Sequence, residues 1–124
     1  MSLPVATRWR WLLVALIATG LGGALAPLGG HTGPQDWLLG ADKLVHFAYF
    51  ALLWWVAVRA QGLRAWPLGL HLLCFGVGIE LAQGILTATR EASLGDVVAD
   101  AAGLLLGAAL TGAASVGQPK EHRR

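Results

Sequence analysis

The sequence Glu80-Leu-Ala-Gln83, followed by a short polar break and then by Asp100-Ala-Ala-Gly103, decides the fold of this chain. Apolar segments lie on both sides of the break, so that Glu80 stands inside one apolar segment and Asp100 stands near the start of the next. A charged group in hydrocarbon is costly unless it faces a partner or a wet cavity. We therefore interpret this stretch as two membrane helices that carry part of a functional site.

The composition supports a membrane protein. The 124 residues are 56% hydrophobic and only 13% charged, with a mean hydropathy of +0.60. A soluble domain carries about twice that charged fraction. Residues 1–124 are expected to form one all-α domain without a separate soluble core. The net charge of +2 does not indicate nucleic-acid binding, because the basic residues lie at termini and in loops. The single cysteine, Cys74, excludes an internal disulfide.

Four apolar segments predict an integral membrane bundle of four transmembrane helices, at about 11–28, 42–60, 67–88 and 94–114. Each has roughly the 17–25 residues that a bilayer requires. Residues 29–41, which are rich in Gly, Pro and Asp, are expected to form a loop. The first segment also fits a signal peptide with a cleavage site at Ala24-Leu-Ala26. Pro27 would directly follow the cut, so we favour a first transmembrane helix.

The distribution of basic residues predicts the orientation. Four spans place most of the basic residues on one side of the membrane: Arg8, Arg10, Arg59, Arg64, Lys120, Arg123 and Arg124. Basic loops favour the cytoplasm, so both termini are expected to be cytoplasmic. Lys43 and Arg90 are then expected at the outer side.

In this topology, polar groups from separate segments reach one outer level of the membrane. Asp42 and His46 are four residues apart and share a helix face. Glu80 lies about 12 Å below the outer end of its helix, and His46 or Arg90 is its expected partner. The predicted ligand-binding set is Asp42, Lys43, His46, Glu80, Gln83, Arg90, Ser93, Asp96 and Asp100.

Structural roles are alternatives for most of this set. Ser93 and Asp96 fit a capping box, and Asp42 fits a helix cap. The two basic side chains fit interfacial charges that extend to water, and the histidine fits a bond to a carbonyl group. Glu80 is hardest to explain in this way, because a buried carboxylate needs a partner.

Glycines at helical spacing predict close packing of helices. Gly103 and Gly107 are four residues apart, and Gly76 and Gly84 flank Glu80 at the same spacing. Small residues let membrane helices approach closely. We expect these glycines to hold Glu80 near Asp100.

The residues leave several chemistries open. The sequence contains no Gly-x-Ser-x-Gly motif and no phosphate-cradling loop. One histidine among carboxylates is thin support for a metal, so neither metal nor cofactor is expected. His46, Glu80 and Asp100 are candidates for acid–base catalysis, but they equally suit the binding of a polar headgroup.

The ordered pieces resemble the VanZ-like family of small bacterial membrane proteins. The matching sequences span about residues 40–110: Asp42-Lys-Leu-Val-His46-Phe-Ala-Tyr-Phe50, Glu80-Leu-Ala-Gln83, Arg90-Glu-Ala-Ser93-Leu-Gly-Asp96, and Asp100-Ala-Ala-Gly103 with Gly107. The family usually has Asn where this chain has Asp100, which adds a titratable group.

The resemblance implies a role in the bacterial cell envelope. The family's named member is linked to resistance to teicoplanin, a lipoglycopeptide that acts at the cell surface. A VanZ-like protein of the cytoplasmic membrane is thus expected to contact membrane lipids and to bind or modify an anionic or amphipathic surface molecule, such as a lipid-linked or lipoglycopeptide ligand. Lys43 and Arg90 would attract it. The sequence leaves oligomer formation open.

Two other functions stay open. The first is a membrane-embedded acid–base enzyme acting on a lipid-linked substrate. The second is a proton-coupled carrier or small channel, since intramembrane carboxylates often lie on ion paths. The inner halves of the predicted helices are almost purely apolar, which argues against the carrier.

Overall fold

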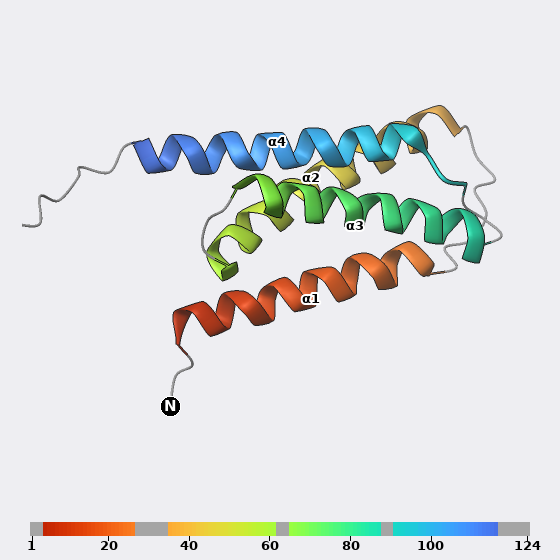
Figure 1. Cartoon of the computed structure of the whole chain (residues 1–124). Coiled ribbons are helices and arrows are strands. Elements are labelled where there is room, and N and C mark those ends of the chain that lie inside the picture. The colour runs from red at the N-terminus through yellow and green to blue at the C-terminus, as the bar shows by residue number, and fades with distance from the viewer. Residues whose placement is uncertain (1–3, 27–34, 62–64, 88–90, 117–124) are drawn as a thin grey trace, which may run out of the picture.

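The protein is a bundle of four helices (Figure 1). The computed structural model describes residues 4–26, 35–61, 65–87 and 91–116, with side chains for 4–26, 40–61, 66–87 and 91–112. The helices are α1 (Val5–Leu25), α2 (Gln35–Gln61), α3 (Ala65–Leu86) and α4 (Leu94–Val116). The described residues contain no strand, so the predicted all-α class is confirmed.

Two helices begin six or seven residues earlier than the sequence predicted. α1 begins at Val5 and α2 at Gln35, so the expected loop at 29–41 is wrong for its last seven residues. Asp42 is therefore not a helix cap but lies two turns inside α2. The prediction placed each helix start where the apolar sequence starts, whereas backbone hydrogen bonding continues a helix into polar sequence.

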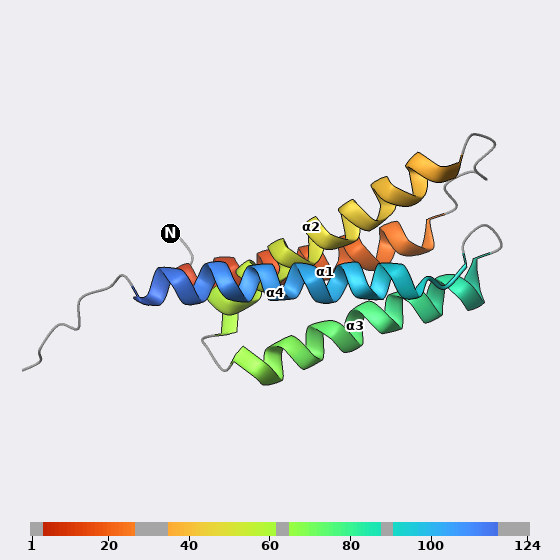
Figure 2. The same cartoon turned by 90° about the horizontal axis from the view of Figure 1, so that it is seen from above.

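Successive helices run in opposite directions, which defines two ends of the bundle (Figures 1 and 2). We call the end where α1 and α3 finish and α2 and α4 begin the acidic end, because it holds Asp42, Glu80, Asp96 and Asp100. We call the opposite end the tryptophan end, after Trp9, Trp55 and Trp66. The basic residues Arg64, Lys120, Arg123 and Arg124 lie outside the described residues.

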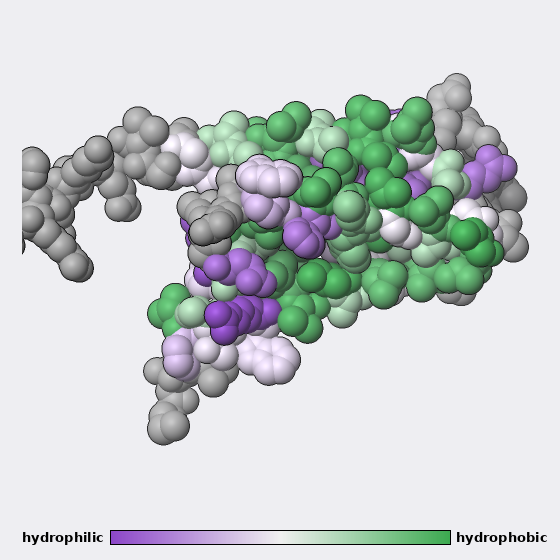
Figure 3. Space-filling model, viewed as in Figure 1, coloured by the Kyte–Doolittle hydropathy of each residue, from purple (hydrophilic) through white to green (hydrophobic). Residues whose placement is uncertain are grey.

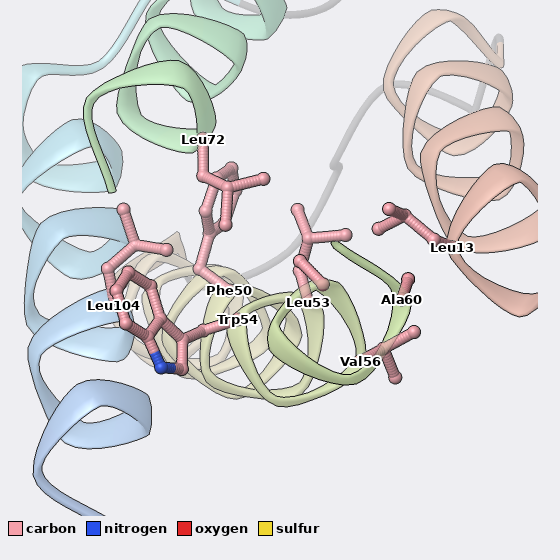
Figure 4. Close-up of a cluster of buried hydrophobic side chains, with 9 residues drawn as sticks. Leu13, Phe50, Leu53, Trp54, Val56, Ala60, Leu72 and Leu104 are labelled. Atoms are coloured by element: carbon pink, nitrogen blue, oxygen red, sulfur yellow. The ribbon is translucent and has the colours of Figure 1, made fainter. Parts of the chain in front are cut away.

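α2 is the central helix and contacts the other three, most extensively α4. Its side chains Phe50, Leu53 and Val56 are fully buried, and Leu13, Leu72 and Leu104 of the other helices pack around them (Figure 4). Since lipid is as apolar as this core, close packing rather than removal from water holds such helices together.

Three of the helices are long and apolar enough to cross a membrane, over Gly40–Gln61, Trp66–Leu86 and Leu94–Gly112. Large apolar side chains point outward along them; Leu94, Ile85 and Leu105 are 80%, 78% and 72% exposed. Figure 3 shows hydrophobic residues over most of one face of the bundle. So extended an apolar surface suits lipid rather than water. The chain is therefore a multi-pass membrane protein in contact with lipid.

α1 differs from the other three helices. It has 21 residues, but Arg8 and Arg10 lie in its first two turns. It is not among the helices that are apolar enough to span, so a fourth transmembrane helix stays a prediction.

Candidate functional site

His46 is the centre of the acidic end, where it contacts carboxylates from two other helices. Its Nδ1 lies 2.9 Å from Oδ1 of Asp100 on α4, and its Nε2 lies 3.8 Å from Oε1 of Glu80 on α3. With Asp100 as a carboxylate, the Nδ1–H group donates this hydrogen bond. Asp100 is fully buried and Glu80 is 3% exposed. Three helices therefore meet in one buried group of titratable side chains.

Glycines make this meeting possible. A Cβ at Gly103, one turn after Asp100, would overlap the carbonyl oxygen of Phe47, the residue next to His46. A Cβ at Gly76 would lie 2.5 Å from Oδ2 of Asp100. Gly103 thus closes α4 onto α2 and holds Asp100 against His46.

The glycines were expected to hold Glu80 near Asp100, and Gly76 on α3 does lie against Asp100 of α4. The other three have different neighbours. Gly107, like Gly103, instead faces α2, where a Cβ would lie 2.8 Å from the Cβ of Trp54. Gly84 packs against Ala92 in the connection before α4, where a Cβ built on Gly84 would lie 3.2 Å from the Cβ of Ala92. Spacing identified the small residues but not the helix that each one faces.

Ser93 caps α4 and also binds Glu80. The Ser93 Oγ accepts a hydrogen bond from the backbone N–H of Asp96 at 3.3 Å, which is the first half of the predicted capping box. The second half does not form, because the Ser93 N–H donates to Oε2 of Glu80 at 2.8 Å. Glu80 therefore takes the place of Asp96 and ties α3 to the start of α4.

The Asp96 carboxylate is thereby left for other partners. Its Oδ1 lies 3.5 Å from Nζ of Lys43, whose side chain is 43% exposed while that of Asp96 is 7% exposed. Ligand atoms of Asp42, His46 and Asp96 lie within 4.8 Å of one another. The start of α2 and the start of α4 thus share one polar cluster.

A cavity of about 310 Å³ lies between α1, α2 and α3, beside His46. Its wall combines polar and apolar side chains: Thr19, Gly20, Gly23, Ala24, Asp42, Val45, His46, Tyr49, Phe50, Ile79 and Gln83. The Gln83 amide donates to the carbonyl oxygen of Ala24 at 3.4 Å, and the Tyr49 hydroxyl donates to that of Leu16 at 2.7 Å. These bonds fix the position of α1 at the edge of the cavity.

The contribution of α1 to this wall was missed by sequence reasoning, which placed no site residue before Asp42. The only signal was the cluster of small residues at Gly20, Gly22 and Gly23. A Cβ at Gly20 would overlap the Tyr49 side chain, whereas a Cβ at Gly23 meets no described atom within 4 Å.

Those predicted ligand-binding residues that the structure describes lie at the acidic end, but in two groups. His46, Glu80 and Asp100 form the buried group, with Ser93, Lys43 and Asp96 beside it. Gln83 belongs to the cavity wall and binds α1 instead. Arg90 lies outside the described residues, so its pairing with Glu80 stays a prediction.

No family model, curated protein or solved structure matches this chain. Membership of the VanZ-like family thus stays a prediction from the matching residues, and any chemistry must come from the site itself. Carboxylates outnumber basic groups among the described side chains of the acidic end: Asp42, Glu80, Glu91, Asp96 and Asp100 against Lys43 and His46. Such a site suits cations and hydrogen-bond donors, and it allows a buried histidine to exchange a proton with a carboxylate.

Proposed function

We propose that this chain is a VanZ-like protein of the bacterial cytoplasmic membrane that binds an amphipathic molecule of the cell envelope. The polar part of the ligand would lie against His46 and its acidic neighbours, and the apolar part would lie in the adjacent cavity. The resemblance to the family supports the envelope role. The observation that supports ligand binding most directly is the cavity, which joins a polar wall to an apolar wall inside a membrane protein.

The lining of the cavity limits the kind of ligand. Asp42, His46 and Gln83 offer carboxylate, imidazole and amide groups, whereas Phe50 and Ile79 offer only hydrocarbon. A volume of about 310 Å³ is at the lower end of the range of roughly 300–1,000 Å³ found for ligand sites. This space suits one acyl segment of a lipid or of a lipoglycopeptide rather than the whole molecule.

The two ends of the bundle support an outward-facing site. Arg10 of α1 and Arg59 of α2 both lie at the tryptophan end, where the Arg10 Nε donates to the carbonyl oxygen of Ala60 at 3.4 Å. Basic residues favour the cytoplasmic side. In our proposal the tryptophan end faces the cytoplasm and the acidic end faces outward.

A direct test uses a phosphatidylethanolamine, whose ammonium headgroup suits the carboxylates of the site, with a photoactivatable group in its acyl chain. In nanodiscs, crosslinks to residues lining the cavity are expected for the wild type and are expected to be lost in Gly23→Leu, which adds a large side chain to the cavity wall at a position where a Cβ meets no described atom within 4 Å. Gly22→Leu is the matched control, because a Cβ there also meets no described atom within 4 Å and Gly22 does not line the cavity. Equal labelling of both variants would reject the cavity as the binding site.

The envelope role has its own test in a teicoplanin-sensitive Gram-positive host. Wild-type protein is expected to lower surface binding of fluorescent teicoplanin. Glu80→Gln and Gly23→Leu, at matched expression, are expected to restore that binding, whereas Gly22→Leu should behave as the wild type. Unchanged teicoplanin binding in cells that express the wild type would remove the resistance role.

A second candidate function is acid–base catalysis on a lipid-linked substrate. The observation that favours it is the order Asp100–His46–Glu80, in which one carboxylate orients the imidazole and another lies beside its second nitrogen. Purified protein would then turn over lipid-linked cell-wall precursors, and His46→Gln would abolish turnover. Absence of turnover by the wild type would reject this candidate. No comparable observation favours a carrier, because the buried side chains beyond Phe50 toward the tryptophan end are apolar in the described residues, apart from the Trp54 indole N–H.

A further inference from the structure

We propose that the acidic end binds one divalent transition-metal ion through Asp42, His46 and Asp96. These residues come from the starts of α2 and α4, so the ion would join the two helices. The proposal does not depend on the identity of any lipid ligand. It also departs from the expectation that the sequence alone supported, which was that a lone membrane histidine binds no metal.

The spacing of the three side chains fits a shared ion. One ligand atom from each lies within 4.8 Å of the other two. Ligand atoms bound at about 2.0–2.2 Å to one metal ion are at most about 4 Å apart, so closure of the site needs only a small side-chain movement. Asp42 is half-buried and on the cavity wall, where it has room to make that movement.

Two buried carboxylate oxygen atoms lack a hydrogen-bond donor among the described residues and have only a loose ionic partner each: Lys43 Nζ lies 3.5 Å from Oδ1 of Asp96, and Nε2 of His46 lies 3.8 Å from Oε1 of Glu80. The side chains of Asp96 and Glu80 are only 7% and 4% exposed. Buried acceptors without donors are rare and costly. Oδ1 of Asp96 belongs to the proposed ligand set, and Oε1 of Glu80 faces the ring of its histidine.

The orientation of His46 is that of a metal ligand. Its Nδ1–H group donates to Asp100, which leaves the lone pair of Nε2 on the side of the ring that faces Glu80. With a neutral imidazole, these two acceptor atoms lie 3.8 Å apart, and a nearby cation would stabilise both. Metal-binding histidines almost always donate their other ring N–H to a carboxylate or carbonyl group. Asp100 would thus be a positioning residue for the metal ligand His46.

Charge also favours a cation. The described residues of this end hold five carboxylates, of which only Glu91 is exposed, but one ammonium group and one histidine. Lys43 is close to Asp96, but its side chain is 43% exposed and long enough to extend to water when an ion binds. Imidazole together with carboxylates suits Mn²⁺, Fe²⁺ or Zn²⁺ better than Ca²⁺ or Mg²⁺. A protonated His46 would satisfy Glu80 without a metal, but it would not bring Asp42 and Asp96 a shared partner.

The test is Mn²⁺ binding to purified protein in detergent, with no added lipid and with a purification tag that contains no histidine. After removal of metals with a chelator, we expect one Mn²⁺ per chain by electron paramagnetic resonance titration. We also expect ¹⁴N modulation of the electron spin echo from the imidazole ligand. Asp42→Asn and His46→Gln should weaken binding at least tenfold, and His46→Gln should also remove the ¹⁴N signal.

Matched variants make the result decisive. Asp100→Asn should weaken Mn²⁺ binding about 10- to 100-fold while keeping the ¹⁴N signal, because it acts through His46. His71→Ala, at an exposed histidine on α3, and Glu91→Gln, at an exposed carboxylate, should not change binding. If His46→Gln does not fold, Asp42→Asn decides, since Asp42 is outside the packed core. Failure of the wild type to bind Mn²⁺, or equal binding by Asp42→Asn, would overturn the proposal and would leave the lipid-crosslinking test unaffected.

Discussion

The two ends of the bundle both carry polar side chains, but they satisfy them differently. At the tryptophan end, Trp9 and Trp55 meet edge to face with ring centroids 5.2 Å apart, and the Arg59 guanidinium lies 3.6 Å from the centre of the Trp55 ring. These groups are near the surface. At the acidic end, Glu80 and Asp100 are buried and reach their partner His46 on another helix.

This difference separates anchoring from binding. Exposed Trp and Arg side chains are typical of a membrane–water interface, where water and headgroups satisfy their polar atoms. The buried carboxylates have no such solvent, and three of their oxygen atoms, on Glu80, Asp96 and Asp100, have no hydrogen-bond donor in the described part of the chain. Burial combined with incomplete hydrogen bonding, rather than polarity, therefore marks the acidic end as the candidate site.

The largest loss of stability is expected for a substitution of Asp100, at the acidic end. Asp100→Leu removes the carboxylate that holds the buried His46 and should lower the free energy of unfolding by about 3–5 kcal/mol. Asp100→Asn keeps an acceptor for the Nδ1–H group and should lower it by about 1 kcal/mol. Reversible unfolding in mixed micelles, followed by circular dichroism, measures both. Equal losses for the two variants would mean that the bond to His46 does not stabilise the fold.

A smaller effect is expected where α4 packs on α2 just below the acidic end. Gly103→Ala places a methyl group against the backbone of Phe47 and should lower the free energy of unfolding by about 1–3 kcal/mol. Gly78→Ala is the matched control, because a Cβ there meets no described atom within 4 Å. The same unfolding measurement applies. A loss for Gly78→Ala as large as that for Gly103→Ala would show that helix contact is not the cause.

A neutral hydrogen bond toward the tryptophan end should matter less than the charged group at the acidic end. The Trp54 indole N–H donates to Oγ1 of Thr111 at 3.1 Å. Thr111→Val removes that acceptor and should lower the free energy of unfolding by about 1 kcal/mol. Thr19→Val is the control, since its hydroxyl is exposed and binds only its own helix. If Thr111→Val lowered the free energy of unfolding more than Asp100→Leu does, the bond toward the tryptophan end would matter more to stability than the charged group at the acidic end.

The smallest effect is expected at the exposed arginine. Arg59→Gln removes the cation stacked on Trp55 and should lower the free energy of unfolding by less than about 1 kcal/mol. Tryptophan emission should shift in Arg59→Gln and stay close to the wild type in Arg59→Lys, which keeps the positive charge. A large stability loss for Arg59→Gln would indicate that this end is a packed site and not an interfacial anchor.

The fold could be predicted well because its signals are local. Apolar segments of membrane length identified the helices that become α2, α3 and α4, and helical spacing put Asp42 and His46 on one face. The starts of α1 and α2 were placed several residues too late, because hydropathy marks the hydrocarbon region and not the end of backbone hydrogen bonding. The serine at the start of α4 was a local signal too, and it forms the predicted cap.

The sequence by itself determined that charged groups enter apolar helices, and it predicted that the segments that become α2, α3 and α4 bring them together. Only the tertiary structure decided which atoms meet: His46 with Asp100, Glu80 with the N–H group of Ser93, and Gly103 with the backbone of α2. Only the tertiary structure showed that α1 forms part of the cavity wall. The physical reason is that these partners depend on how each helix is rotated about its axis. Helices that are apolar on most sides do not encode that rotation locally, since it is set by packing among all four helices.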